Sequence, residues 1–296
     1  MKKLNELIGN TPLIEVQHIY QKDGVKLYGK LEGNNPGGSV KDRAAYGMIS
    51  GAIERGDVKA GDQLVEATSG NTGIALAMIA QTFGLKMTLI MPESATRERV
   101  LTMKAYGAEV ILTPADKTIE YSRKLAQEMS EQQDYHMLNQ FANPDNYGMH
   151  YRTTGPEIYR DTNQTVTHFV SAMGTTGTIM GVSRYLKEQN PDIQIVGTQP
   201  EDGSRIPGIR RWSPEYLPAI YEADRVDHII DVSRDQAMTM ARRLAKEEGI
   251  LSGMSSGGAL TAAIQVAESI KSGVIVFIVC DRGDRYLSTD LFSESV

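Results

Sequence analysis

The sequence predicts an α/β fold with two domains, each built on a mostly parallel, twisted sheet flanked by helices. The chain has 296 residues, and a typical domain takes roughly 150. Its hydrophobic fraction is 41%, which allows a sizeable core and argues against disorder. Short apolar runs alternate with longer amphipathic ones, and this order is typical of βαβ units with right-handed crossovers.

In the first half of the chain, apolar runs of strand length alternate with segments that have helical spacing. Val100, Met103 and Tyr106, for example, recur at helical spacing over a charged face. We expect, in order, a strand at Asp62–Ala67, a turn at Ser69–Gly73, a helix at Ile74–Phe83, a strand at Lys86–Met91, a helix at Ala95–Tyr106, a strand at Glu109–Leu112, a charged helix at Thr118–Gln132 and a closing segment at Tyr135–Asn139.

The second half repeats this pattern after the turn-forming residues Asn143–Tyr147, where we place the boundary between the halves. The last apolar run suits a strand buried on both faces of a parallel sheet. We expect a strand at Val166–Ala172, a loop at Met173–Gly177, a helix at Thr178–Gln189, strands at Ile193–Thr198 and Val226–Val232, helices at Arg234–Glu248 and Ser256–Ile270, and a strand at Val274–Cys280.

Three loops that follow strands and precede helices carry small polar residues. Ligands in open α/β sheets bind beyond the carboxyl ends of the strands. Backbone N–H groups at a helix N-terminus favour an anion, although Ser, Thr and Asn are also ordinary helix caps. Ser256 is a candidate cap, which would leave Ser255 just outside its helix. The loops are Thr68–Gly73, Gly174–Thr178 and Gly253–Gly258.

The loop Gly174–Thr178 has the composition of a phosphate-binding turn. Glycines let backbone amides approach an anion, and threonine hydroxyls add donors. Several charge-assisted hydrogen bonds of about 1.5–3 kcal/mol each would outweigh a helix dipole worth about 0.3–1 kcal/mol. The chain contains neither G-x-x-x-x-G-K-[ST] nor G-x-G-x-x-G, so a phosphate outside a nucleotide fits better. A tight turn without a ligand is the alternative.

Lys41 follows the turn-forming segment Gly33–Ser39 and begins a predicted helix. A lone lysine is usually a solvated surface charge. Desolvation beside the positive end of a helix would make this amine nucleophilic enough to form a Schiff base. A reactive lysine, a phosphate-binding loop and a small polar loop together indicate pyridoxal phosphate.

Motifs along almost the whole chain resemble the cysteine synthase family (O-acetylserine sulfhydrylases), and most closely its B-type members. This family belongs to the fold-type II pyridoxal-phosphate enzymes, so the resemblance implies a tryptophan synthase β-like fold. The motifs are IGNTPL (Ile8–Leu13), KLEGNNPGGSVKDR (Lys30–Arg43), EATSGNTGIALA (Glu66–Ala77), GTTGT (Gly174–Thr178), PGIRRW (Pro207–Trp212), SSGGA (Ser255–Ala259) and CDRGDRYLST (Cys280–Thr289).

The resemblance implies a role for each matching position. Lys41 would hold pyridoxal 5'-phosphate as an internal aldimine, Asn71 would hydrogen-bond the ring oxygen, and Ser255 would meet the pyridine nitrogen. The phosphate would bind to Gly174, Thr175, Thr176, Gly177 and Thr178. The substrate carboxylate would bind to Thr68, Ser69, Asn71, Thr72 and Gln140.

The resemblance also implies β-replacement on O-acetyl-L-serine. Lys41 would remove the α-proton, loss of the β-leaving group would give an α-aminoacrylate, and sulfide would add to give L-cysteine. Because the Ser255 hydroxyl cannot keep the pyridine nitrogen protonated, transamination is disfavoured. Arg210, Arg211 and Asp281 lie in motifs that resemble those of the B-type enzymes, and the resemblance makes all three candidate substrate-binding residues. We expect Arg210, with Arg211, to admit thiosulfate, which would give S-sulfocysteine; surface charge is the alternative.

The domains implied by the resemblance are discontinuous. The smaller would comprise residues 1–12 and 35–145 with the substrate-carboxylate loop, and the larger residues 13–34 and 146–296 with the phosphate-binding loop. A subdomain at about Lys86–Glu131 would close over bound substrate and exclude water. A homodimer is expected. Binding to serine acetyltransferase is expected to be weak or absent, because the A-type enzyme is its usual partner.

Composition and charge exclude several other classes. The net charge of −6 argues against nucleic-acid binding, and a single cysteine, Cys280, excludes a disulfide framework and a cysteine-rich zinc site. The five histidines show no pair at ligand spacing, so we expect no metal. The sequence shows no signal-length or membrane-spanning apolar run. We therefore expect a cytoplasmic protein that acts on small molecules.

Other functions use the same features. An O-phosphoserine-using cysteine synthase or a cystathionine β-synthase-like enzyme would have the same lysine and loops. A serine or threonine dehydratase is disfavoured, because its loop usually reads SAGNHAQG. From a different class, a non-catalytic phosphate-ligand binding protein stays open, although Lys41 together with all three loops counts against it.

Overall fold

The computed structural model describes residues 1–117, 119–132 and 134–293. Contacts divide the chain into two compact units, and each is discontinuous. The first consists of Met1–Ile8 and Lys41–Asn146, and the second of Gly9–Val40 with the chain from Tyr147 onward. The domain bounds expected from the sequence stay a prediction.

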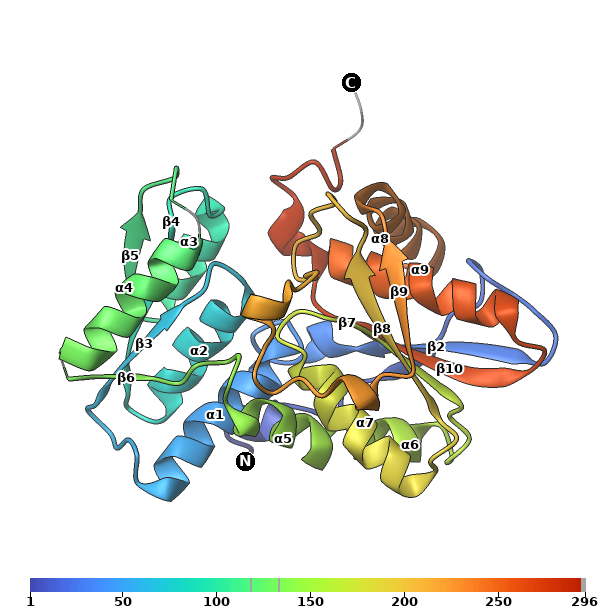
Figure 1. Cartoon of the computed structure of the whole chain (residues 1–296), viewed down its shortest axis with the longest axis horizontal. Helices are drawn as coiled ribbons and strands as arrows, with labels where there is room; N and C mark the ends of the chain where they lie inside the picture. The colour runs from blue at the N-terminus through green and yellow to red at the C-terminus, as the bar shows by residue number, and fades with distance from the viewer. Residues whose placement is uncertain (118, 133, 294–296) are drawn as a thin grey trace. The chain divides into compact units, whose positions relative to one another are not determined.

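The first unit is a four-stranded sheet in the order β5-β4-β3-β6, with every pair of neighbours parallel (Figure 1). Its chain order begins with a short 3-10 helix at Leu4–Leu7. The elements that follow are α1 (Lys41–Arg55), β3 (Gln63–Ala67), α2 (Asn71–Thr82), β4 (Lys86–Pro92), α3 (Arg97–Ala105), β5 (Glu109–Thr113), α4 (Ile119–Gln132) and β6 (Tyr135–Met137).

Successive side chains of β3 point to opposite faces of this sheet. Leu64 packs with buried residues of α1 and α2, such as Met48 and Ile79. Val65 packs with Ala126 and Met129 of α4. Helices therefore cover both faces, and the polar loop after β3 lies at the carboxyl edge of the sheet.

The second unit is a six-stranded sheet in the order β1-β2-β10-β7-β8-β9. All neighbours are parallel except β1 and β2, which are antiparallel. The unit contains β1 (Leu13–Glu15), β2 (Val25–Leu31), α6 (Thr154–Asp161), β7 (His168–Ala172), α7 (Gly177–Gln189), β8 (Gln194–Pro200), β9 (His228–Val232), α8 (Arg234–Glu248), α9 (Met254–Ser269) and β10 (Gly273–Val279), with 3-10 turns at Glu32–Asn34, Pro214–Tyr216, Ala223–Arg225 and Gly283–Tyr286.

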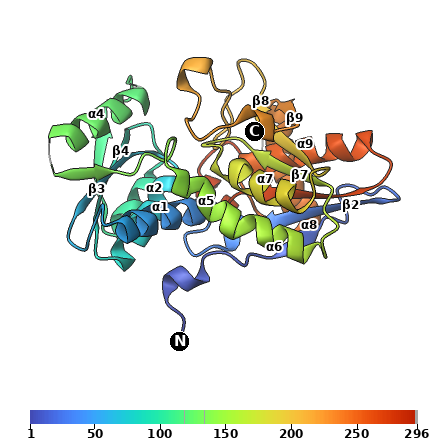
Figure 2. The same cartoon turned by 60° about the horizontal axis from the view of Figure 1, so that its bottom comes forward.

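Two layers of helices enclose this second sheet. Val170 of β7 packs with residues of α8 and α9, including Leu260. Phe169, the residue before it, packs with Ile158 of α6 and Ile179 of α7 on the other face. Figure 2 shows α6 and α7 together on one side of the sheet. A strand with both faces covered needs apolar residues at nearly every position, which explains the apolar run of β10.

The α/β fold class with mostly parallel sheets is confirmed, and the expected strands and helices are present, most of them with shifted ends. Thr118, the expected first residue of a helix, lies outside the described residues. The sequence patterns missed β1, β2, α6 and α5 (Pro144–Arg152), the helix that begins in the first unit and ends in the second. No helix in the described part of the chain is long and apolar enough to cross a membrane.

Candidate active site

Lys41 is the first residue of α1, and the segment before it is tied to the carboxyl end of β10. The Val40 N–H donates a hydrogen bond to the Cys280 carbonyl at 2.8 Å, and Ser39 forms an antiparallel bridge with Asp281. Gly38 has φ +82°, and a Cβ there would lie 2.5 Å from the Arg285 guanidinium. Only glycine fits this turn, so Lys41 follows a segment with a fixed path.

The loop Thr68–Gly73, here called the substrate loop, leads from β3 into α2. The helix begins at Asn71, three residues earlier than expected, so Asn71 and Thr72 lie in its first turn. The Thr68 N–H donates to the Ile90 carbonyl at 3.1 Å. The N-terminus of a helix favours an anion, which makes this place suitable for a carboxylate.

Gln140 lies beside the substrate loop. The Thr72 hydroxyl donates to Gln140 Oε1 at 2.8 Å, and both side chains are buried. Asn146 donates its amide hydrogen to the Gln140 carbonyl at 2.8 Å. The first unit therefore brings Thr72 and Gln140 into direct contact.

Glu66, which the sequence analysis did not single out, holds the turn that carries Gln140. Its carboxylate accepts the Asn139 N–H at 3.0 Å, and Asn139 adopts a left-handed conformation with φ 53°. Burial raises the pKa of Glu66 to about 7, and the N–H groups of Asn139 and Gln140 offset part of that rise. The signal in the sequence was a charged residue inside an apolar strand, directly before the substrate loop.

The loop Gly174–Thr178, here called the phosphate cup, connects β7 to α7. The helix begins at Gly177, and its N-cap Thr176 has φ 70°. A Cβ at Gly174 would lie 2.8 Å from the Gly208 carbonyl oxygen, so only glycine fits there. The Trp212 indole N–H donates to the Gly174 carbonyl at 2.9 Å. Contacts with Gly208 and Trp212 thus fix the first residue of the cup.

The chemistry of the cup fits a phosphate. Among the described residues, the buried Thr176 hydroxyl has no hydrogen-bond partner. A buried hydroxyl without a partner costs roughly 1–3 kcal/mol, and an anion at the N-terminus of α7 would accept from it. The N-terminus of α7 at Gly177 also favours an anion.

Ser255 lies inside α9, which corrects the expectation that it precedes the helix. Gly253 is the N-cap, so Ser255 is in the first turn. Ser256 is not the cap, because its hydroxyl accepts the Cys280 N–H at 2.9 Å. Ser255 borders the segment after the phosphate cup, since a Cβ at Gly208 would lie 3.3 Å from Ser255 Oγ.

Asp281 is fully buried and braces the helix that carries Ser255. One carboxylate oxygen accepts the Gly253 N–H at 3.2 Å, and the other accepts the Tyr286 hydroxyl at 2.6 Å. The carboxylate thus touches the N-cap of α9 rather than solvent.

Arg210 and Arg211 are neighbours with different surroundings. Arg210 donates its backbone N–H to the Met173 carbonyl at 2.8 Å, while its exposed guanidinium lies 5.5 Å from the centre of the Trp212 ring. Arg211 instead donates to the Pro200 carbonyl at 2.8 Å and forms an ion pair with Asp231. Of the two, Arg210 lies beside the phosphate cup with its charge exposed.

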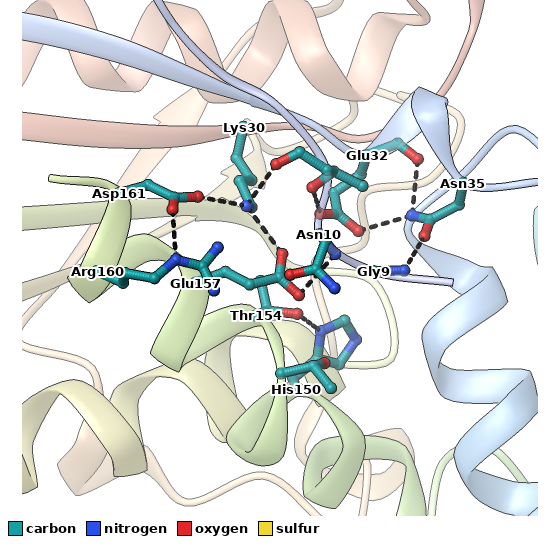
Figure 3. Close-up of polar contacts among 12 residues, drawn as sticks. Gly9, Asn10, Lys30, Glu32, Asn35, His150, Thr154, Glu157, Arg160 and Asp161 are labelled. Carbon is teal, nitrogen blue, oxygen red and sulfur yellow. Dashed lines mark hydrogen bonds and ion pairs between the residues drawn. The ribbon is translucent and has the colours of Figure 1, made fainter. Parts of the chain in front are cut away.

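A network of polar side chains surrounds the buried Lys30 (Figure 3). Lys30 is fully buried, and its ammonium contacts Glu157 at 2.8 Å and Asp161 at 3.3 Å. His150, which is 1% exposed, contacts the hydroxyl of Thr154, and Figure 3 shows this contact beside the residues around Lys30. In the sequence, Lys30 is only the start of a motif, and His150 is one of five histidines without a pair at ligand spacing.

Each unit thus gathers part of the predicted residues. The first unit holds Lys41, Thr68, Ser69, Asn71, Thr72 and Gln140, and the second holds the phosphate cup, Ser255, Asp281, Arg210 and Arg211. In the part of the chain that the structure describes, no three His, Cys, Asp or Glu side chains are placed to hold a metal ion.

Comparisons with known proteins agree on one family. The family model described as "Pyridoxal-phosphate dependent enzyme" matches residues 4–281. Cysteine synthase B of Pseudomonas aeruginosa is 56% identical over 97% of this chain and 96% of its own length. Cysteine synthase B of Escherichia coli is 54% identical over 99% of this chain and 97% of its own length. The solved cysteine synthase of Entamoeba histolytica has a TM-score of 0.93 at 39% identity, and covers 100% of this chain and 93% of its own.

Proposed function

The chain belongs to the pyridoxal-phosphate dependent enzymes and, within them, to the cysteine synthases of the B type, and from this premise we propose which of its residues carry the reaction. Its activity is that of a cysteine synthase, which replaces the acetoxy group of O-acetyl-L-serine by the sulfur of sulfide and releases acetate. Pyridoxal 5'-phosphate, when bound, withdraws electrons from the substrate's α-carbon and so permits loss of a proton there.

The phosphate cup is the proposed anchor for the cofactor. Gly174, Thr175, Thr176, Gly177 and Thr178 offer backbone N–H groups and hydroxyls to the phosphate. The observation that supports this most strongly is the buried Thr176 hydroxyl without a partner among the described residues, because a phosphate oxygen would satisfy it.

Lys41 is the proposed catalytic residue. When pyridoxal 5'-phosphate is bound, the Lys41 amine would hold it covalently, and the same amine, once released, would take the α-proton from the substrate. The fixed path of Gly38, Ser39 and Val40 supports this role. Such a path limits where the lysine can reach and so lowers the entropic cost of placing it. We assign Asn71 to the ring oxygen of the cofactor and Ser255 to its pyridine nitrogen.

The substrate carboxylate is proposed to bind at the start of α2. Thr68 and Ser69 precede that helix, Asn71 and Thr72 lie in its first turn, and Gln140 contacts Thr72. Closure of the segment at about Lys86–Glu131 would then exclude water from the reaction.

For the sulfur donor, we propose that the enzyme accepts thiosulfate as well as sulfide. The exposed Arg210 guanidinium beside Trp212 supports this, since an anionic donor gains from a nearby positive charge. The ion pair of Arg211 with Asp231 makes Arg211 the weaker candidate.

Steady-state competition tests the substrate assignment. Purified holoenzyme would be offered O-acetylserine or O-phosphoserine, each with sulfide or thiosulfate, and kcat/KM would be measured for the four pairs. We expect O-acetylserine to be preferred and both donors to be used. A preference for O-phosphoserine would contradict the proposed leaving group, and failure with thiosulfate would contradict the proposed second donor.

Borohydride reduction followed by peptide mass analysis tests the role of Lys41. We expect the reduced cofactor on Lys41 and a Lys41→Ala variant without turnover. Full turnover by that variant would overturn the assignment.

The holoenzyme is proposed to be a cytoplasmic homodimer that binds serine acetyltransferase weakly or not at all. Light scattering and a pull-down test the dimer and the acetyltransferase, and a tight, stoichiometric complex would contradict the last point.

A further inference from the structure

His150 lies between the phosphate cup and α6, with a hydroxyl at each ring nitrogen. Nδ1 is 2.8 Å from the Thr154 hydroxyl, and Nε2 is 3.3 Å from the Thr178 hydroxyl. Thr178 is the second residue of α7 and belongs to the phosphate cup. The Thr154 side chain is fully buried, and those of His150 and Thr178 are nearly so.

The surroundings of Thr154 fix the direction of its hydrogen bond. Among the described residues, its hydroxyl has a single side-chain partner, Nδ1 of His150. If Nδ1 carried a proton, the buried hydroxyl proton of Thr154 would have no acceptor, which costs roughly 1–3 kcal/mol. Thr154 therefore donates, and Nδ1 accepts.

This direction determines the tautomer of a neutral imidazole. With Nδ1 as the acceptor, the ring proton lies on Nε2. Nε2 then donates to the Thr178 oxygen, and Thr178 keeps its own hydroxyl proton for another acceptor. With the opposite tautomer, Thr178 would donate to His150 and turn oxygen lone pairs toward the cup, where they would repel an anion.

We propose that Thr154, His150 and Thr178 form a one-way hydrogen-bond chain that aims the Thr178 hydroxyl proton at the cofactor phosphate. His150 is thus a positioning residue, which acts on the cofactor through Thr178. The inference rests on the proposed role of the phosphate cup.

The buried network beside Thr154 keeps α6 in place for this chain. Glu157 lies one turn after Thr154 on α6. Its carboxylate contacts Lys30 at 2.8 Å and accepts the Asn10 N–H at 2.9 Å. Both carboxylate oxygens of Glu157 thus have a donor (Figure 3). The first turn of α6 is held by charge pairing, and Thr154 has a defined position opposite Nδ1.

Nitrogen NMR of the holoenzyme with ¹⁵N-labelled histidine tests the proposal directly. The signals of His150 would be assigned by their loss in His150→Gln. We expect a pyridine-type Nδ1 and a pyrrole-type Nε2 in the native protein, and a mixture of tautomers in Thr154→Val. Thr153→Val is the matched control, because that hydroxyl donates to the Met149 carbonyl instead. A protonated Nδ1 in the native protein would overturn the chain.

Cofactor binding provides the second readout. We expect Thr154→Val to raise the dissociation constant of pyridoxal 5'-phosphate about three- to tenfold, as for the loss of one aligned hydrogen bond. Thr153→Val should leave it unchanged. We expect Thr178→Val to weaken binding at least as much, and to shift the ³¹P signal of the bound phosphate.

The variants also separate the two proposals. If neither Thr176→Val nor Thr178→Val changes the cofactor's dissociation constant, the cup does not bind the phosphate. The proposed hydrogen-bond chain, which depends on the cup, is then contradicted as well. If both cup variants weaken binding but Thr154→Val leaves the constant and the histidine signals unchanged, the cup stands and the chain is overturned.

Discussion

The carboxylate of Glu66 accepts the backbone N–H of Asn139 at 3.0 Å, and this bond joins the end of β3 to the turn after β6. The residue after Asn139 is Gln140, which accepts the hydroxyl of Thr72. A buried carboxylate thus holds the part of the first unit to which we assign the substrate carboxylate.

Glu66 should make the stability of the protein depend on pH. Burial raises its folded-state pKa to about 7 from an ordinary value of 4.5. Between these values the folded protein binds more protons than the unfolded chain, so the stabilisation is present below about pH 4.5 and is lost as pH rises through 7. We expect the free energy of unfolding, relative to Glu66→Gln, to fall by on the order of 2–3 kcal/mol between pH 5 and 8. Urea titrations at several pH values measure this.

The exposed Glu93 provides the control for that series. Glu93→Gln should run parallel to the native protein at every pH. A constant difference between native and Glu66→Gln protein from pH 5 to 8 would show that Glu66 does not titrate in this range.

The backbone conformation of Thr176 should destabilise the protein, while its hydroxyl should strengthen cofactor binding. Thr176 is a β-branched residue with φ 70°, a conformation that costs roughly 1–2 kcal/mol for residues other than glycine. We expect Thr176→Gly to raise the unfolding free energy of the cofactor-free protein by about 1 kcal/mol and to weaken cofactor binding, because the hydroxyl is lost. Thr176→Ser keeps the hydroxyl and should bind the cofactor normally. Unchanged cofactor affinity in Thr176→Gly would argue against the role of this hydroxyl.

Arg210 and Arg211 form a matched pair for the choice of sulfur donor. We expect Arg210→Ala to lower kcat/KM for thiosulfate about tenfold, the loss of one charge-assisted hydrogen bond, and to leave the value for sulfide nearly unchanged. Arg211→Ala should change kcat/KM for neither thiosulfate nor sulfide, since the Arg211 guanidinium is bound by Asp231 and the Pro200 carbonyl. Equal effects of the two substitutions would contradict a specific role for Arg210.

Lys30 should be one of the most sensitive positions for stability. Lys30→Met leaves Glu157 and Asp161 without their buried partner (Figure 3), and breaking such a pair costs about 3–5 kcal/mol. Lys26→Met makes the same change at an exposed position of the same strand and should have little effect. Thermal unfolding of both variants measures the difference, and similar melting temperatures would contradict the prediction.

Much of the fold could be predicted because apolar periodicity reports directly on burial. The run now seen as β10 is apolar at nearly every position, and α8 has the predicted bounds Arg234–Glu248. β2 was missed because Lys26 and Lys30 interrupt its pattern. Only the fold shows that Lys30 points into the protein, where residues far along the chain neutralise it.

The candidate site could be predicted where its chemistry is local. The features that make Gly174–Thr178 a candidate anion site are one turn and one helix N-terminus, and both can be read from adjacent residues of the sequence. Glu66 and His150 could not be found in this way, because their partners come from other elements. The position of Ser255 within α9 was also missed, since a serine pair does not reveal which neighbour caps the helix; the cap is Gly253.

The position of β2 between β1 and β10 has a consequence for synthesis on the ribosome. β2 ends at Leu31 and β10 begins at Gly273, so at roughly 5–20 residues per second the nascent chain carries β2 for on the order of ten to fifty seconds before that neighbour emerges. In this interval residues 41–146 can already form the sheet of the first unit. A strand with one unpaired edge can pair with a strand of another chain. We therefore expect the nascent chain to bind chaperones during synthesis.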